Sequence, residues 1–356
     1  MFAFIVRNAP FALAVAALAG CSSNVSFGGD GDGGGGGGAT SSAQGAGGST
    51  TSSAGSGTPG LACSGPNSAG PATACTPQDA GCNPGKSVCA AVEVVDGAPS
   101  FALKMAHISF SKPAALSSGI AKSVLQNWLG PPPPVCHIPN FLLAWIFRFD
   151  LTAGTLTTGG ARQGAGMAPG FQLIDDISAG AAITPVVAPI ALGAGCDLDV
   201  TVGDLNVPIQ YDPGFASNFH LPFRKLRLHG GKVSPDHNCI GVYNDALLSP
   251  GDACAPTDAV PAYTHGAQLD GWMSLEEADA VIISPLQQSL CVFLSQDAAA
   301  YGEQVDQYKL CARGPDGQIV FKGDWCSATD QPATAGCADA VKVTATFAAS
   351  GVKMAP

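Results

Sequence analysis

The side chains of this chain that could do chemistry are concentrated in one basic segment. Five of them fall within nine residues: Arg224, Lys225, Arg227, His229 and Lys232. Successive side chains of a β-strand point to opposite faces, so Lys225, Arg227 and His229 would share one face of a strand here. Leu226 and Leu228 would point the other way. Such a basic stripe is suited to binding an anion, and ordinary ion pairing with acids on neighbouring strands is the alternative interpretation.

The rest of the chain is acidic. The formal net charge is −11, and the segment from Val233 to Tyr308 holds 11 acidic residues and neither Lys nor Arg. Because nucleic-acid-binding proteins usually carry a basic excess, we expect no nucleic-acid partner. The contrast between this acidic segment and the basic stripe predicts docking to an anionic envelope polymer, a lipid headgroup or an acidic protein.

Histidines and catalytic motifs give weaker signals. Three histidines lie within 18 residues, with Asp236 beside the last: His220, His229 and His237. They could supply a zinc site if two strands brought them together, but surface and loop histidines are the simpler interpretation. The sequence contains no GxSxG, HExxH or GxxxxGK[ST] motif. We therefore predict no metal, no cofactor and no identifiable catalytic residue.

The first 20 residues have the proportions of a signal peptide. They read MFAFIVRNAPFALAVAALAG, with Arg7 as the only charge. The apolar run from Phe11 to Ala19 is too short to span a bilayer comfortably.

The signal peptide ends in Leu18-Ala19-Gly20-Cys21, which resembles the lipobox of bacterial lipoproteins. The resemblance covers residues 1–21 only, and the remainder carries no family motif. It implies cleavage before Cys21, acylation of Cys21 and anchoring to the lipid bilayer, because two or three acyl chains bind a membrane stably. Ser22 follows the cysteine in place of the Asp that marks inner-membrane retention, which favours the outer membrane.

Composition divides the chain into four parts. These are a signal peptide (1–20), a Gly/Ser-rich tether (21–62), a small Cys-rich strap (63–98) and a main domain (99–356). The tether contains an unbroken glycine run from Gly33 to Gly38. A chain of this composition buries too little apolar surface to fold and behaves as a flexible coil.

Cysteine usage indicates a disulfide framework. Of 13 cysteines, the lipidated Cys21 is set aside, and an even number remains, as in exported proteins with up to six bridges. Cys239 with Cys254 and Cys326 with Cys337 are reasonable pairs by proximity in sequence. Spacing alone does not fix the connectivity.

Several segments alternate in the manner of β-strands. One runs from Phe141 to Leu151, and others include Phe101 to Met105 and Val341 to Phe347. In the segment CDLDVTVGDLNVPIQY (196–211), the apolar positions change from even to odd across Gly203-Asp204. This change of phase predicts a two-residue hairpin, because such a turn places residues 202 and 205 opposite each other.

The same hairpin would have a polar outer side. Asp197 and Asp199 would point outward, as a solvated strand face or, alternatively, as calcium ligands. Pro208 would also lie on the outward face, with its nitrogen toward solvent or a bulge.

Two helices are expected. Ser117 or Ser118 could cap one that ends at Gly130. Ser274 and Glu277 form a capping box for the other, which would continue to Ile282 and end or restart at Pro285. The segment from Leu290 to Leu294 could be helix or strand. Because strands outnumber helices, we predict a mainly β protein: an antiparallel β-sandwich or open barrel with one or two edge helices, stapled by disulfides.

These features predict a membrane-anchored exported lipoprotein with a noncatalytic binding or envelope-structural role. An exported hydrolase with an Asp/His site that follows no familiar motif is the alternative. A carbohydrate-binding module is a third possibility, which four Trp and five Tyr residues disfavour, because sugar sites use exposed aromatic rings. A concave pocket in which Asp and His side chains converge would distinguish an enzyme from a flat binding surface.

Overall fold

The computed structural model describes residues 89–118, 144–163, 170–178, 181–210, 218–249 and 256–355, apart from single positions at 90, 92, 96, 194, 245 and 258. All of them belong to one compact unit, Ala54–Pro356. The expected signal peptide, the lipobox with Cys21, the tether and most of the strap lie outside the described residues. No helix in the described ranges has the length and hydropathy needed to cross a bilayer.

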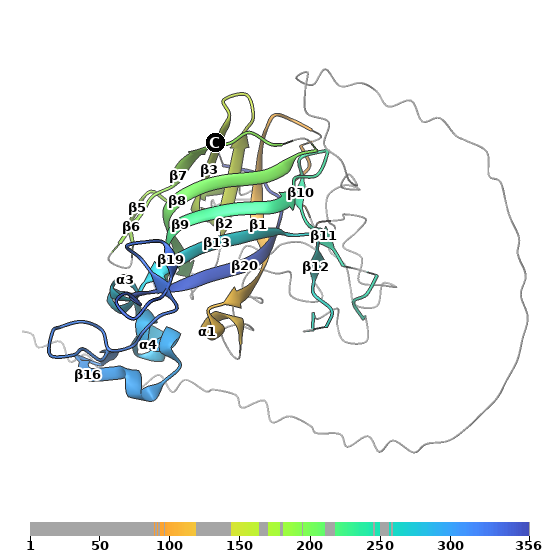
Figure 1. The fold of residues 1–356 in the computed structure, drawn as a ribbon. Helices are drawn as coiled ribbons and strands as arrows, with labels where there is room; N and C mark the ends of the chain where they lie inside the picture. Colours follow the sequence, from red (N-terminus) through yellow and green to blue (C-terminus); the bar gives the residue numbers. More distant parts are fainter. Residues whose placement is uncertain are drawn as a thin grey trace, which may run out of the picture. The chain divides into compact units, whose positions relative to one another are not determined.

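One large antiparallel sheet dominates the fold (Figure 1). Its strands are β1 (Ser100–Lys112), β2 (Trp145–Asp150), β3 (Thr155–Gln163), β4 (Phe171–Leu173), β7 (Val186–Pro189), β8 (Asp197–Gln210), β9 (Asn218–Lys232), β10 (Cys239–Ile240), β13 (Ala267–Ser274), β18 (Trp325–Cys326), β19 (Gln331–Pro332) and β20 (Ala340–Gly351). The main path runs β4-β3-β2-β1-β20-β13-β9-β8, while β7 pairs with β3, β10 with β20, and β18 with both β19 and β20.

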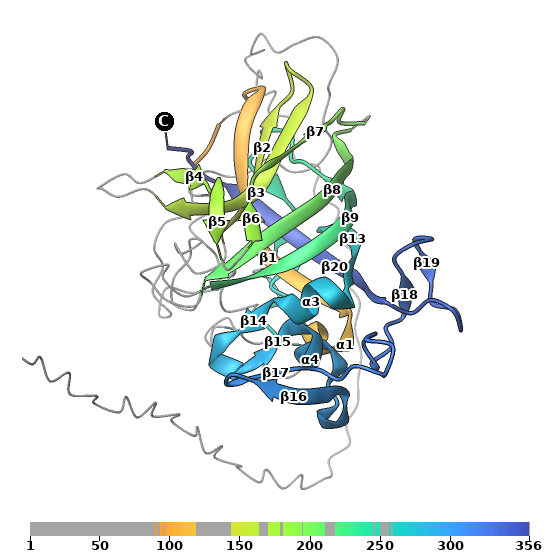
Figure 2. The same ribbon diagram turned by 90° about the vertical axis from the view of Figure 1, so that its left-hand side faces the viewer.

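Smaller elements flank this sheet. Two short hairpins are formed by β5 (Asp176–Ser178) with β6 (Ala181–Ile183) and by β11 (Val242–Tyr243) with β12 (Tyr263–Thr264). Helix α1 (Ala114–Ser117) follows β1. A helical module at one end of the sheet (Figure 2) contains α3 (Leu275–Ala280), β14 (Ile282–Ile283), η2 (Ser284–Leu286), β15 (Gln288–Ser289), α4 (Leu290–Ser295), η3 (Ala298–Ala300), β16 (Tyr301–Val305) and β17 (Tyr308–Cys311).

The sheet is curled around a single large core. Alternate residues of the long strands face inward, such as Leu103 and Met105 of β1 and Phe147 of β2, and the core continues into α3 and α4 of the module. The prediction of a mainly β, antiparallel, disulfide-stapled open barrel is therefore confirmed. The alternating segments around Phe101, Trp145 and Val343 all lie in strands, as expected.

The segment 196–211 is not a hairpin, which corrects the sequence-based prediction. Strand β8 runs without a turn through Gly203 and pairs along its length with β9. Register shifts occur on both sides of Gly203, whose φ is +90°, a conformation that glycine adopts without strain. β9 has a matching irregularity at Lys225, with φ +48°. At these two residues, both strands change which of their alternate side chains point to the core. The apolar residues of each strand therefore stay on one face.

The predicted inner and outer sides of this segment are nevertheless correct. The buried set includes Leu198, Val200, Leu205 and Val207, while Asp199 is exposed. Pro208, which was expected on an exposed outer face, is buried.

The two expected helices have different outcomes. Ser274 caps α3, and its Oγ accepts a hydrogen bond from the Glu277 backbone N–H at 3.4 Å. This helix ends at Ala280, earlier than expected, and a short 3₁₀ turn contains Pro285. The segment from Leu290 is helical, which settles the open alternative. α1 ends at Ser117, and residues 119–143, where the other helix was expected, lie outside the described residues.

Three disulfides are described. Cys326–Cys337 is the predicted pair, whereas Cys239 bonds to Cys89 and not to Cys254. Cys291–Cys311 joins α4 to β17. Cys196 is disulfide-bonded as well, although its partner is not among the described residues.

Candidate functional site

A pocket lies on the face of the sheet that is turned away from the core. It has a volume of about 390 Å³ and is lined by Lys225, Arg227, His229, Asp270, Gly271, Trp272, Trp325, Asp330 and Lys342. We call it the Trp–Lys pocket. The strands β9, β13 and β20 supply its floor, and the β18–β19 hairpin supplies the remaining side chains.

Strand alternation places the floor residues. In β9, Leu226 and Leu228 are buried in the core, so Lys225, Arg227 and His229 point to the opposite face. The predicted shared face of these three residues is thus observed. The same rule places Asp270 of β13, whose neighbour Leu269 is a core residue.

Four basic side chains of the pocket share three carboxylates. Lys225 pairs with Asp330 and Arg227 pairs with Asp199 on β8. The third carboxylate belongs to Asp270, and it serves two basic groups. His229 Nε2 lies 2.5 Å from one of its oxygens, and Lys342 Nζ lies 3.7 Å from the other. Lys225, Arg227 and Lys342 carry fixed positive charges that match the three carboxylates, and His229 adds to this count only when it is protonated.

The ion pairs differ in how tightly they hold their cations. Arg227 makes two hydrogen bonds to Asp199, at 2.9 and 2.7 Å. Lys225 lies 3.5 Å from Asp330, and Lys342 lies 3.7 Å from Asp270. These two separations exceed the 2.7–3.2 Å of a normal N–H···O hydrogen bond. Since an ammonium group has three donors, Lys225 and Lys342 retain donor capacity toward a ligand.

Strand pairing, a disulfide and a hydrogen bond fix the position of Trp325 in its hairpin. Trp325 pairs with Ala340 of β20, and the next residue, Cys326, is bonded to Cys337. The Trp325 indole Nε1 donates to Asp330 at 3.1 Å. Lys342 Nζ lies 4.5 Å from the centre of the indole ring, a cation–π distance. The aromatic ring is therefore preorganised beside a charged group.

A second indole also belongs to the pocket. Trp272 is 8% exposed, and its buried Nε1 has no hydrogen-bond partner among the described residues. A buried N–H without a partner is energetically unfavourable.

The remaining residues of the predicted anion-binding stripe lie outside the pocket. Arg224 makes hydrogen bonds to Glu277 at 2.9 and 2.6 Å, and Lys232 pairs with Asp197 at 2.7 Å. Every basic residue of the stripe thus has an acidic partner, as the ion-pairing interpretation expects. The same pairs account for Asp197 and Asp199 without calcium. Anion binding by the five-residue stripe stays a prediction.

The three candidate histidines are not gathered into a metal centre. Among the described residues, the groups of side chains close enough to hold an ion contain no histidine. His237 stacks on Phe101 and contacts the Ala98 carbonyl oxygen at 2.7 Å, whereas His229 belongs to the Trp–Lys pocket. Burial lowers the pKa of His220 to about 4, with a smaller contribution from Arg224.

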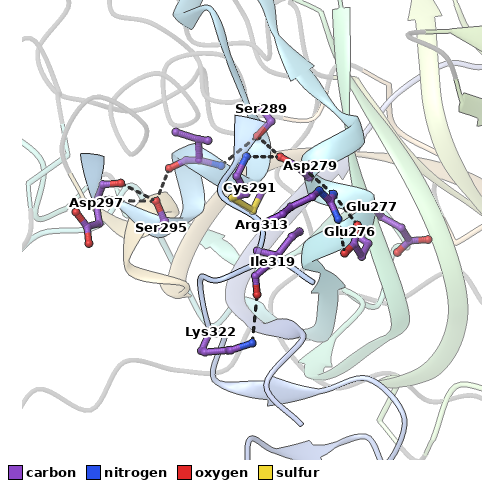
Figure 3. Close-up of a disulfide and its surroundings, with 12 residues drawn as sticks. Glu276, Glu277, Asp279, Ser289, Cys291, Ser295, Asp297, Arg313, Ile319 and Lys322 are labelled. Carbon is purple, nitrogen blue, oxygen red and sulfur yellow. Dashed lines mark hydrogen bonds and ion pairs between the residues drawn. A yellow bond between two sulfur atoms is a disulfide. The ribbon is translucent and has the colours of Figure 1, made fainter. Parts of the chain in front are cut away.

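A second polar cluster surrounds the Cys291–Cys311 disulfide (Figure 3). Asp279, only 4% exposed, accepts hydrogen bonds from Ser289 Oγ at 2.8 Å, the Cys311 N–H at 2.7 Å and Arg313 at 3.0 Å. The two sulfur atoms are bonded to each other in the disulfide, and the Asp279 carboxylate already accepts hydrogen bonds from these three donors. These contacts assign the cluster a structural role in the helical module.

Two other buried titratable residues lie on β1, on the side opposite Leu103. Burial lowers the pKa of Lys104 to about 7, and among the described residues the Nζ donates to the Met105 carbonyl oxygen alone, at 3.4 Å. Burial likewise lowers the pKa of His107 to about 4. Lys104 is 0% exposed, so it does not contact solvent or a dissolved ligand.

Comparison with known proteins gives no relatives. No family model matches the chain, and no curated protein or solved structure shows significant similarity to it.

Sequence reasoning identified the residues of the Trp–Lys pocket that lie on β9 and missed those on the other strands. The basic stripe identified Lys225, Arg227 and His229 through strand alternation. Trp325 and Lys342 are distant in sequence from that stripe, and pairing of β20 with β13 and β18 brings them to it. The useful signal was the alternation of Trp272 with buried Met273, which marks the tryptophan as an outward side chain.

Proposed function

We propose that this chain is an exported, lipid-anchored binding protein of the cell envelope, and that the Trp–Lys pocket binds an anionic ligand. The lipobox-like sequence ending at Cys21 and the disulfides support export and anchoring, since structural disulfides are typical of exported proteins. An anionic envelope polymer is the partner that the loosely paired Lys225 and Lys342 favour.

One observation carries the binding role. Lys225 and Lys342 line the same pocket beside Trp325, and both are held at more than hydrogen-bond distance by their carboxylates. An anionic ligand can therefore accept hydrogen bonds from them without breaking a tight pair. Charge-assisted hydrogen bonds of this kind are stronger than neutral ones.

One feature of the pocket favours a hydrolase as the second candidate function. His229 and Asp270 converge in it, at 2.5 Å. In the described structure, however, His229 has no hydroxyl or thiol partner that it could activate as a nucleophile. This pair alone could still activate water, so turnover must be measured together with binding.

Two measurements test the proposal. Intact-mass analysis of the membrane fraction should show a mature chain that begins at an acylated Cys21, and an unmodified Cys21 would remove the anchor. Titration of the full mature protein in detergent with a polyanion such as polygalacturonate or polyglutamate should show saturable binding. Lys225→Gln with Lys342→Gln should weaken that binding at least tenfold.

Lys232→Gln is the matched control. Lys232 lies on β9 but outside the pocket and is paired with Asp197 at 2.7 Å. It removes one charge from β9, as Lys225→Gln alone does, so equal losses in these two single variants would indicate diffuse electrostatic attraction and not a site. Release of reducing ends from the polymer, abolished by His229→Ala, would instead support the hydrolase.

A further inference from the structure

We propose that the Trp–Lys pocket is specific for an acidic saccharide, a sugar ring that carries both hydroxyl groups and a carboxylate. This inference rests on the proposed anion-binding function and names the ligand class. The Trp–Lys pocket combines three features that such a ligand needs: an aromatic ring, hydrogen-bonding groups of both polarities, and lysine ammonium groups that are only loosely paired.

The aromatic feature favours a ring with an apolar face. Two of the four tryptophans of the chain, Trp272 and Trp325, line this one pocket. The π face of an indole is electron-rich, so it attracts the weakly positive C–H groups on one face of a pyranose. A small inorganic anion would make no use of either ring.

The hydrogen-bonding groups favour hydroxyls. A hydroxyl both donates and accepts, so it needs acceptors and donors within one pocket. Asp270 and Asp330 supply carboxylate oxygens, and Lys225 and Lys342 supply N–H groups. A plain polyanion, which only accepts, would leave the two carboxylates facing its own negative charge.

The spacing of the lysines favours a carboxylate on the bound sugar. Lys225 lies 3.5 Å from Asp330 and Lys342 lies 3.7 Å from Asp270, so neither ammonium group makes a short hydrogen bond to its acid. A ligand carboxylate next to Lys342 would accept such a bond. A neutral hydroxyl would accept it less strongly, because charge-assisted hydrogen bonds are stronger than neutral ones.

The test compares three polymers on the full mature protein in detergent micelles. Polygalacturonate carries rings, hydroxyls and carboxylates, dextran lacks the carboxylates, and polyglutamate lacks the rings and hydroxyls. We expect polygalacturonate to bind at least tenfold more tightly than either of the others. Galacturonate monomer is the fourth probe: binding as tight as that of one polymer unit would identify a free acidic sugar, and weaker binding would identify a polymer, both within the proposed class.

Substitutions in the pocket test whether the preference for polygalacturonate arises there. Trp325→Ala should weaken polygalacturonate binding at least tenfold and leave polyglutamate unchanged, while Trp325→Phe should restore part of the loss. Thermal unfolding checks that the hairpin remains folded. If Trp325→Ala does not fold, Lys342→Gln replaces it, with the expectation that polygalacturonate binding falls to the level of dextran.

The outcomes separate the two proposals. Equal affinities for polygalacturonate and polyglutamate, both unaffected by Trp325→Ala, would overturn the saccharide specificity and leave anion binding intact. Equal affinities for dextran and polygalacturonate would overturn the acidic specificity. Failure of every polyanion to bind would overturn both proposals together.

Discussion

Gly160 of β3 packs directly against Pro208 of β8, and this contact joins two distant parts of the curled sheet. A Cβ atom placed on Gly160 would lie 2.3 Å from Pro208 Cγ. β3 and β8 are separated by five intervening strands on the main path of the sheet. Their contact therefore depends on the curl, and on the absence of a side chain at residue 160. Because Pro208 has no N–H, it is suited to β8, the last strand of that path.

We expect Gly160→Val to destabilise the protein by about 1–3 kcal/mol, the usual range for overpacking a core contact. Gly336→Ala is the control, because a Cβ there would meet no atom within 4 Å. Urea unfolding of both variants measures the difference. Similar unfolding midpoints would show that the contact between β3 and β8 can open without loss.

The second prediction concerns the two sides of β8. Val200 is 2% exposed, whereas Asp199 is exposed and paired with Arg227. Val200→Asp should cost several kcal/mol because it buries an unpaired charge, and Asp199→Ser should cost less than about 1 kcal/mol because it removes an exposed ion pair. Thermal unfolding of the two variants checks this. Comparable losses would contradict the assignment of inner and outer faces.

The third prediction uses pH. Lys104 has a pKa of about 7 in the folded protein and 10.5 when unperturbed, because burial disfavours its charged form. Between these values the unfolded state binds more protons, so this residue makes stability rise as pH increases from 7 to 10.5. Lys104→Met removes the penalty. Its stabilising effect should be largest at and below pH 7, on the order of a few kcal/mol, and should vanish near pH 10.5.

The matched control for this pH experiment is Lys353→Met, since Lys353 is exposed. Denaturant unfolding at several pH values gives the difference between each variant and the wild type, which cancels the titration of all other groups. A Lys104→Met effect that does not change between pH 7 and 10 would contradict a neutral buried amine.

The fourth prediction concerns the buried carboxylate of Asp279. Arg313→Met removes its only described basic partner and should destabilise the protein by about 1–3 kcal/mol, less than for a fully buried pair because Arg313 is 41% exposed. Adding Asp279→Asn should recover part of the loss, since the amide carries no charge. Guanidinium unfolding of the single and double variants measures the coupling. Arg162→Met serves as the control, because its pair with Asp176 is exposed.

The sequence predicted the strands well and their connections less well. Alternation identifies the buried side of β1, β2, β8 and β20 because each strand has one face on the core. A change of phase, however, has two physical causes: a two-residue turn reverses the chain, and an irregularity such as that at Gly203 shifts the pattern while the chain continues. Either cause would produce the alternation pattern that the segment 196–211 contains. The partner strand β9 decides between them, since Lys225 interrupts it at the same level.

The candidate site was predictable only where it lies on one strand. Lys225, Arg227 and His229 follow from the period of β9. Lys342 reaches the pocket through pairing of β20 with β13, and Trp325 through pairing of β18 with β20; local patterns do not encode these long-range pairings. The cysteines show the same limit: Cys326–Cys337 closes a short loop, but Cys89–Cys239 joins residues 150 positions apart.

The Cys89–Cys239 disulfide also determines how mechanical force would enter the sheet. Residues before Cys89 connect to the sheet in two ways, along the backbone into β1 and through the disulfide into β10, which pairs with β20. A pull on the amino-terminal side is therefore divided between two strands at Cys89, and a covalent bond prevents β1 from being peeled away alone. Tension applied on the amino-terminal side of Cys89 would therefore reach β10 and its partner β20 as well as β1.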